Sequence, residues 1–211
     1  MRQSEIIGLL IVCASLLTGV IFYPQLPDRI PFHWNQYGEV NQYTSKFWGV
    51  FLMPIILLGC FILLVIVPRI DPLKENIKQF IKYYDGFLII FLIVLLFIQL
   101  WMLSWNLGQR IDPTPISALC LGGLFYYLGI LTEHARRNWF VGIRTPWTLS
   151  SEIVWHKTHK IGGVLFRICG ILSVLGGFLG NYGIYLIIGP VILSGIFLTI
   201  YSYILYQKLP K

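Results

Sequence analysis

Charged residues are scarce in this chain of 211 residues, at 12% of the total against about a quarter in ordinary globular proteins. Acidic residues are the rarest, with nine Asp and Glu against 16 Lys and Arg, for a formal net charge of +7. This shortage excludes a typical soluble domain and indicates an integral membrane protein. The long apolar runs carry no carboxylate or histidine, which argues against a proton- or ion-coupled transporter.

Catalytic and metal-binding motifs are also missing. The four cysteines (Cys13, Cys60, Cys120 and Cys169) all fall in apolar runs, match no metal-ligand spacing and give no reason to expect a disulfide framework. The chain has no nucleophile elbow, no glycine-rich phosphate loop and no His-Glu-x-x-His sequence. We therefore expect no enzyme activity and no cofactor.

The chain is rich in long apolar runs. A bilayer core needs roughly 20 apolar residues in a helix. Four uncharged runs each supply one span, at residues 6–23, 47–67, 86–107 and 115–132. The last run, 168–206, is too long for one span and must turn at Gly180-Asn181-Tyr182-Gly183. The sequence predicts an all-α integral membrane protein, one domain over residues 1–211, with six transmembrane helices and short interfacial amphipathic helices.

The fifth span places a charge in the membrane. Between Arg167 and the turn lie too few residues to cross a bilayer, so the helix must begin by about Ile161. Arg167 then either reaches back to the interface or pairs with Glu133 or Glu152. In the same span Gly163, Gly170 and Gly177 recur every seven residues, which predicts close backbone packing.

The distribution of Lys and Arg predicts the orientation. Residue 2, segments 68–85 and 133–167 and the C-terminal tail hold 13 of the 16, and only Arg29, Lys46 and Arg110 lie on the other side. Because cytoplasmic loops carry the excess of positive charge, both termini should be cytoplasmic. The protein should be a multi-pass plasma-membrane protein, and its net charge reflects orientation in the lipid bilayer rather than nucleic-acid binding.

The N-terminal two-span unit, residues 1–67, contains an external loop over residues 24–46. Pro24, Pro27 and Pro31 should keep this loop extended, and Gly38 allows a tight turn. Its aromatic residues suit the membrane–water boundary. Alternatively, the loop is a receptor surface on which the external ligand meets His33, Trp34 and Asn35.

Segment 68–85, before spans three and four (86–132), should form one cytoplasmic interfacial helix. Asp71 is a suitable N-cap, apolar residues fall on one face, and Lys74, Lys78 and Lys82 fall on the other, beside anionic headgroups. Binding to the lipid surface and docking of a soluble partner both remain open.

Segment 133–160, before spans five and six (161–207), is polar, aromatic and basic. Glu152, Trp155, His156 and His159 recur at three- and four-residue steps and should share one helix face. That face could lie on the membrane, dock a protein, or bind a divalent metal through Glu152, His156 and His159 with help from Glu133 and His134, as a membrane metalloenzyme would. The predicted partner surface comprises Arg144, Thr145, Pro146, Trp147, Glu152, Trp155, His156 and His159.

Two stretches resemble a known family. Residues 140–152 (Phe-Val-Gly-Ile-Arg-Thr-Pro-Trp-Thr-Leu-Ser-Ser-Glu), continued by Val154-Trp155 and 157–160, resemble the signature of the SdpI family of bacterial immunity proteins. Leu26-Pro27, Ile30-Pro31, His33-Trp34-Asn35 and Gly38 resemble a small domain of unknown function that precedes it in many members. The resemblance implies protection against a secreted peptide toxin and, in some members, a receptor that holds a small cytoplasmic repressor at the membrane. It implies no catalytic or ligand residues.

Overall fold

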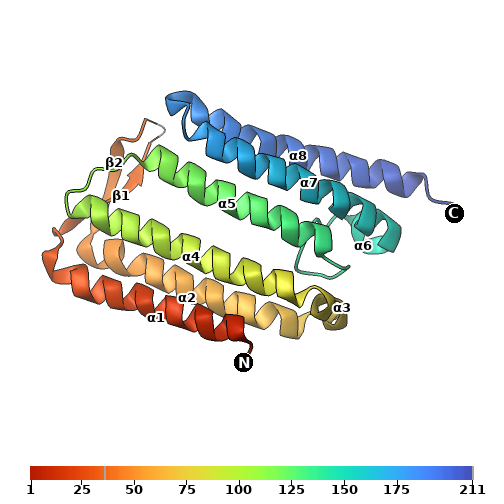
Figure 1. Ribbon diagram of the computed structural model, residues 1–211, viewed down its shortest axis with the longest axis horizontal. Helices are drawn as coiled ribbons and strands as arrows, with labels where there is room; N and C mark the ends of the chain where they lie inside the picture. The colour runs from red at the N-terminus through yellow and green to blue at the C-terminus, as the bar shows by residue number, and fades with distance from the viewer. Residues whose placement is uncertain (36, 211) are drawn as a thin grey trace.

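The computed structural model describes residues 1–35 and 37–210 (Figure 1). Within these residues, six helices are long and apolar enough to cross a bilayer: α1 (Gln3–Phe22), α2 (Lys46–Ile70), α4 (Ile81–Asn106), α5 (Pro113–His134), α7 (Glu152–Gly176) and α8 (Gly183–Gln207). The six predicted spans are confirmed. The turn between the last two is the short 3₁₀ helix η2 (Gly180–Tyr182), and the fifth helix begins nine residues before Ile161.

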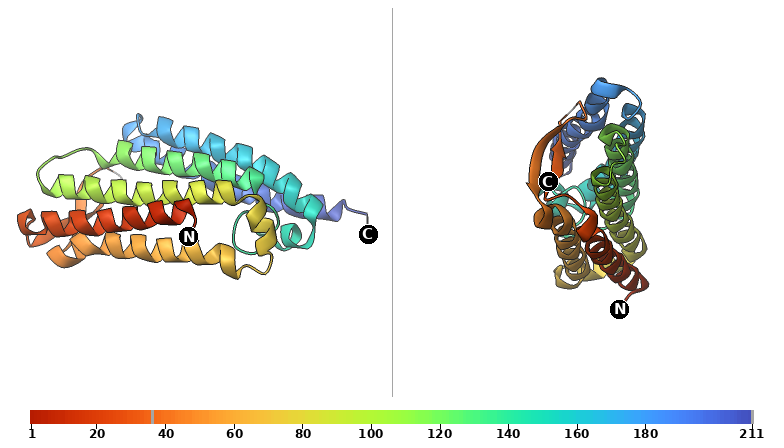
Figure 2. Two further views of the ribbon diagram at one scale, coloured as in Figure 1. Left: turned by 60° about the horizontal axis from the view of Figure 1, so that its bottom comes forward. Right: turned by 90° about the vertical axis from the view of Figure 1, so that its left-hand side faces the viewer.

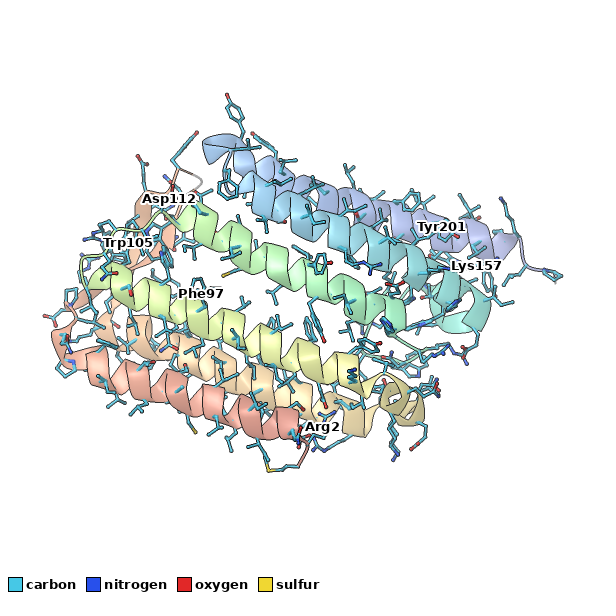
Figure 3. The ribbon with its side chains drawn as sticks, viewed as in Figure 1. Arg2, Phe97, Trp105, Asp112, Lys157 and Tyr201 are labelled. Carbon is cyan, nitrogen blue, oxygen red and sulfur yellow. The ribbon has the colours of Figure 1, made fainter. Side chains whose placement is uncertain are left out.

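The helices form two groups of three (Figures 1 and 2). We call α1, α2 and α4 the N-terminal triplet and α5, α7 and α8 the C-terminal triplet; α4 and α5 lie side by side where the triplets meet. Both termini lie at one end, together with the short helices α3 (Lys74–Gln79) and α6 (Pro146–Ser150). We call this the inner end and the opposite end the outer end. Figure 3 shows Trp105 and Asp112 at the outer end.

The two triplets pack by different means. In the N-terminal triplet, large side chains interdigitate in a buried cluster of Val12, Leu57, Phe61, Leu88 and Leu92. Because lipid supplies no hydrophobic drive between helices, this packing rests on van der Waals contact and on polar bonds. One such bond joins α4 to α1, where the Gln99 side-chain amide donates to the Ser15 carbonyl oxygen at 3.0 Å.

In the C-terminal triplet, backbones meet directly. A β-carbon built on Gly170 would lie 2.6 Å from the carbonyl oxygen of Gly122, and one on Gly163 would lie 2.9 Å from that of Gly129. These contacts between α5 and α7 are possible only without a side chain. The glycine repeat of the fifth span therefore packs closely on the fourth as predicted, with Gly163 and Gly170 against glycines and Gly177 against Ala118.

The prediction of one interfacial helix over residues 68–85 is wrong. Helix α2 runs through Pro68 to Ile70, α3 is a separate short helix, and α4 already begins at Ile81. A proline leaves the carbonyl four residues before it without its helical donor. That carbonyl belongs to Leu64, and the Tyr84 hydroxyl donates to it at 2.8 Å, so the helix continues.

The apolar face predicted for that segment packs on protein instead of lipid. Ile77, Phe80 and Tyr84 are buried in one cluster with Leu131 and Trp155. Asp71 is buried, and one of its oxygens accepts from the Leu73 N–H at 2.6 Å in the turn before α3; the predicted N-cap role is wrong, because the N-cap of α3 is Leu73. Lys74, Lys78 and Lys82 remain exposed.

The structure also contains a β-hairpin, which the all-α prediction did not include. After the 3₁₀ helix η1 (Tyr23–Gln25), strands β1 (Arg29–Trp34) and β2 (Val40–Ser45) pair antiparallel, with Arg29 opposite Ser45 and Trp34 opposite Val40. Gly38 forms the predicted tight turn, with a positive φ of 76°. Ile30 anchors the hairpin by packing with Leu26, Val50 and Leu103. The hairpin lies along one flank of the bundle, from the N-terminal toward the C-terminal triplet (Figure 2, right).

Candidate functional site

One candidate site is a cavity of about 470 Å³ at the outer end. The hairpin and α4 supply one side of it, and α5, η2 and α8 supply the other, so both triplets contribute. Most of the wall is apolar, with Phe32, Ile98, Ile116 and Ile187 among its residues, and Thr114 and Ser117 add hydroxyl groups. We call it the outer cavity.

Trp34 is the most constrained side chain of the outer cavity. Its ring centroid lies 4.7 Å from that of Trp101 and 5.5 Å from that of Trp105. The Arg110 guanidinium lies over Trp105, and the Trp101 indole N–H donates to the carbonyl oxygen of Ile111 at 3.2 Å. The indole N–H of Trp34 is itself buried and has no hydrogen-bond partner among the described residues. Trp34 therefore leaves a buried, unpaired donor in the wall of the cavity.

His33 and Asn35 line the same cavity as Trp34, so the three residues predicted to face an external ligand lie together. Their polar groups also fold the hairpin. His33 Nδ1 donates to Asn41 Oδ1 at 2.7 Å, and the Asn35 amide donates to Glu39 Oε2 at 3.0 Å. Asn35 Oδ1 accepts from the N–H groups of Tyr37 and Glu39.

At the inner end, residues 133–160, which we call the inner segment, form a folded cap. Asn138 is fully buried: its Oδ1 accepts from the N–H groups of Phe140 and Val141, and its amide donates to the carbonyl oxygens of Arg136 and Val141. The Trp139 N–H donates to the carboxylate of Asp71 at 2.9 Å, which ties the cap to the start of α3. Sequence reasoning missed Asn138, although a lone amide among turn residues is a signal for such a loop.

The four residues predicted to share one face do lie on one side of α7, but that side is only partly exposed. Glu152 and His156 are exposed, whereas Trp155 and His159 are buried. The Trp155 indole N–H donates to the Ala135 carbonyl oxygen at 2.8 Å. Trp155 and His159 belong to the stripe that α7 buries, together with Val154, Thr158 and Gly162, whereas Glu152 and His156 lie beyond the edge of that stripe.

His159 uses both ring nitrogens inside the protein. Nδ1 lies 2.8 Å from the Trp155 carbonyl oxygen and must donate to it, so Nε2 accepts the Ile143 N–H at 3.0 Å. Gly142 passes directly over this ring with a positive φ of 112°. His159 therefore fixes the loop of the inner segment.

The residues of the alternative metal site do not converge. Glu152 Oε1 lies 3.1 Å from Arg137 Nε, His134 stacks on Tyr83, and Glu133 pairs with Arg167. Among the described residues, no group of three or more His, Cys, Asp or Glu could hold a metal ion. With the nitrogens of His159 also engaged, this arrangement argues against the metalloenzyme hypothesis.

Of the signature residues 144–147, two contact α8 and two are exposed on the surface. Thr145 caps α6 by accepting from the Thr148 N–H at 3.2 Å, and its hydroxyl lies 3.0 Å from that of Ser202 on α8. Trp147 packs on Tyr203. Arg144 and Pro146 are exposed, and Arg144 donates to the Trp139 carbonyl oxygen at 3.0 Å. Thr145 and Trp147 thus hold the segment on α8.

Arg167 pairs with Glu133, one of the two outcomes that the sequence left open. Its Nη2 lies 2.7 Å from Glu133 Oε2, which joins the middle of α7 to the end of α5. Each side chain is about 30% exposed.

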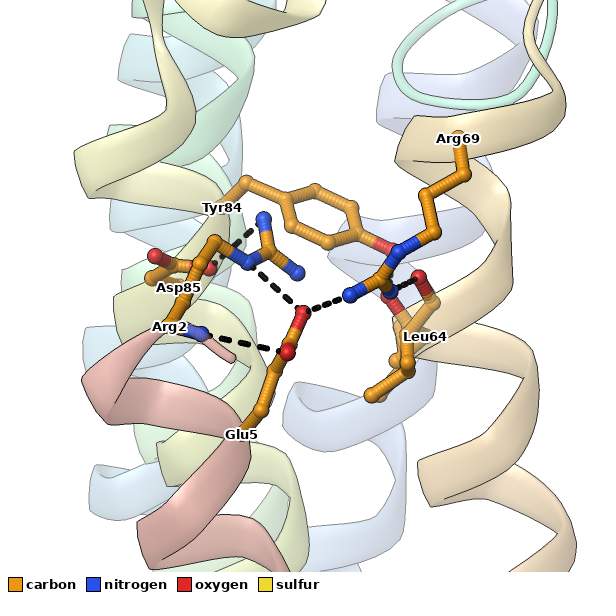
Figure 4. A network of polar contacts seen from close by, with 7 residues as sticks. Arg2, Glu5, Leu64, Arg69, Tyr84 and Asp85 are labelled. Carbon is orange, nitrogen blue, oxygen red and sulfur yellow. Dashed lines mark hydrogen bonds and ion pairs between the residues drawn. The ribbon is translucent and has the colours of Figure 1, made fainter.

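A second ion-pair network was missed (Figure 4). Glu5 is buried and its Oε1 lies 3.0 Å from Arg2 Nε and 2.6 Å from Arg69 Nη2, while Arg2 Nη1 lies 3.0 Å from Asp85 Oδ1. The network joins the inner ends of α1, α2 and α4. Starting the first span at residue 6 left Glu5 outside it; the three-residue spacing of Arg2 and Glu5 was the available signal.

The fold and these sites define a multi-pass membrane protein with an open cavity at one end and a closed, hydrogen-bonded cap at the other. The chain belongs to the SdpI/YfhL protein family, whose model matches residues 134–202, and a model described as domain of unknown function DUF1648 matches residues 10–58. It is 31% identical over 208 residues to "Immunity protein SdpI" of Bacillus subtilis (strain 168), covering 98% of both chains. No solved structure matches the chain. Six apolar spans and this membership identify a multi-pass bacterial membrane protein.

Proposed function

We propose that this protein confers immunity to a secreted peptide toxin and that the toxin binds in the outer cavity. The likeness to a protein named as an immunity protein extends over nearly the whole chain, which supports the general function. The observation that carries the site is an apolar cavity with the unpaired indole N–H of Trp34 buried in its wall, at the end that the charge distribution predicts to be external.

The chemistry of the outer cavity suits a peptide. Its volume lies within the range of small-molecule pockets, and it has room for a few apolar side chains. An unpaired buried N–H costs about 1–3 kcal/mol, so a peptide carbonyl that accepts from Trp34 would recover that cost. Leu121 and Ile188 line the cavity and are exposed on the flank of the helices, so a membrane-bound peptide would have access from the side.

A survival assay tests the site. The protein and its variants would be expressed in a bacterium that secreted peptide toxins kill, with equal membrane levels confirmed by immunoblot. Trp34→Ala should lower survival about tenfold, because it removes the donor and much of the wall. Trp48→Ala is the matched control, since Trp48 is half exposed and does not line the cavity. Equal survival of the two variants would contradict the site, and no protection by the wild-type protein would contradict the function.

We also infer a signalling role, in which the exposed face of α7 holds a small cytoplasmic repressor. Glu152 and His156 lie on this face beside Lys157 and Lys160, and Pro146 is exposed nearby. Of the residues predicted for the partner surface, Arg144, Pro146, Glu152 and His156 are exposed to a soluble protein. Thr145, Trp155 and His159 are buried and hold the cap together. Reversing the charge of Lys157 and Lys160 should release a fluorescent repressor from the membrane without changing survival. Continued membrane attachment would contradict the signalling role.

A further inference from the structure

A second cavity, of about 310 Å³, lies near the inner end of the C-terminal triplet. Residues 142–145 close it on one side, and α5, α7 and α8 form its walls through Leu128, Phe166 and Leu198. We call it the inner cavity. It is separate from the outer cavity, with which it shares no residue, and the proposed immunity function does not use it.

The mouth of the inner cavity carries a cation with free donors. Arg144 is exposed, makes one hydrogen bond to the Trp139 carbonyl oxygen, and has no ion pair with a carboxylate in the described part of the chain. Arg2, Arg69, Arg137 and Arg167 each have a carboxylate partner, whereas Arg29, Arg110 and Arg136, like Arg144, have none among the described residues but do not line this cavity. A guanidinium binds phosphate through two parallel N–H bonds, a geometry that an ammonium group lacks.

Behind this cation the wall is open and apolar. Gly195 lines the cavity on α8, and a β-carbon built there would meet nothing within 4 Å. Leu128, Phe166 and Leu198 supply hydrocarbon, while the Thr199 hydroxyl is bonded to the Gly195 carbonyl oxygen. Because these helices are membrane spans, the open side at Gly195 faces acyl chains.

We propose that the inner cavity binds an anionic phospholipid, with the phosphate on Arg144 and one acyl chain against Gly195. A single cation at the mouth of an apolar cavity matches an amphiphile with an anionic head and a hydrocarbon tail. Basic pockets between transmembrane helices on the cytoplasmic side commonly bind anionic headgroups, and the charge distribution predicts the cytoplasmic leaflet for this end. The signature residues 142–145 would then serve as a lipid site as well as a structural loop.

The test measures lipid retention by the full-length protein. Protein purified in detergent would be mixed with phosphatidylglycerol or phosphatidylcholine of equal chain length, and bound lipid would be counted by native mass spectrometry. Wild-type protein should retain phosphatidylglycerol at least about fivefold more strongly than phosphatidylcholine, which is the effect of about one cation–headgroup interaction. Inorganic phosphate at the same concentration should not displace the lipid, because it leaves the apolar wall empty.

Two variants test the site independently. Arg144→Gln should abolish the preference for phosphatidylglycerol. Gly195→Leu should reduce binding of both lipids, because the leucine side chain would occupy the space proposed for the acyl chain. Gly189→Leu is the matched control on the same helix, since a β-carbon at Gly189 also meets nothing within 4 Å and Gly189 lies outside the inner cavity. Equal binding of the two lipids by the wild type, or unchanged binding in Gly195→Leu, would overturn the proposal. The Gly195 variant keeps the test valid if Arg144→Gln fails to fold.

Discussion

The two triplets solve the same packing problem in lipid by opposite means. The C-terminal triplet brings backbones together at paired glycines, so its geometry tolerates no added atom at those positions. The N-terminal triplet interdigitates large side chains and fastens its inner end with the Glu5 network. Between them, Tyr83 stacks on His134 at the inner end, whereas the outer cavity separates them at the outer end. The C-terminal triplet therefore depends on close backbone contact, and the N-terminal triplet depends on side-chain packing together with buried charges at its inner end.

The largest expected effect comes from breaking the backbone contact of the C-terminal triplet. A β-carbon on Gly122 would lie 2.9 Å from the carbonyl oxygen of Gly170, so Gly122→Leu should destabilise the protein by about 3 kcal/mol or more. Unfolding in mixed detergent micelles measures this. Gly123→Leu is the control, because a β-carbon there meets nothing within 4 Å. Similar stability of the two variants would contradict the backbone-contact account.

A smaller effect is expected from removing the charge that fastens the N-terminal triplet. Glu5→Gln should cost about 2 kcal/mol, because a buried carboxylate is lost from between the guanidinium groups of Arg2 and Arg69. The same unfolding assay applies. Its control is Glu75→Gln, since the Glu75–Lys78 pair is about two-thirds exposed and should contribute about 0.5 kcal/mol or less. If Glu75→Gln lowers the free energy of unfolding as much as Glu5→Gln does, burial is not the reason that the Glu5 network stabilises the protein.

The smallest effect is expected from the ion pair inside the C-terminal triplet. Arg167→Gln should cost about 1 kcal/mol, because the pair with Glu133 is partly exposed and the glycine contacts still hold α5 against α7. A double-mutant cycle with Glu133→Gln isolates the coupling between the two side chains. A cost above that of Glu5→Gln would reverse the comparison between the triplets.

Hydropathy was sufficient to predict the membrane spans. A helix in lipid must satisfy its backbone internally and present apolar side chains, so four of the apolar runs each map onto one helix, and the last run, which turns at residues 180–183, maps onto two. The glycine spacing in residues 163–177 also predicted which helix would pack by backbone contact. Both signals are local along the chain, which is why a single sequence reveals them.

The features that sequence reasoning missed depend on distant partners. Pro68 was taken as a boundary because nothing local replaces its missing hydrogen bond, yet the Tyr84 hydroxyl satisfies the Leu64 carbonyl from another helix. The hairpin was missed because three prolines obscure its alternation. His159 was assigned to the surface because its helical spacing is the same whether the ring faces a partner protein or the loop at Ile143.

The imidazole of His159 also limits which residue related proteins can carry at the position of Gly142. Gly142 has a positive φ, and a side chain there would run into the imidazole of His159, so two separate constraints exclude every other residue at this position. Any protein that folds its inner segment in this way should carry glycine here whenever it carries the histidine. A relative that has lost the glycine should also have lost the histidine, whereas a relative that has lost only the histidine should keep the glycine, because the positive φ still requires it.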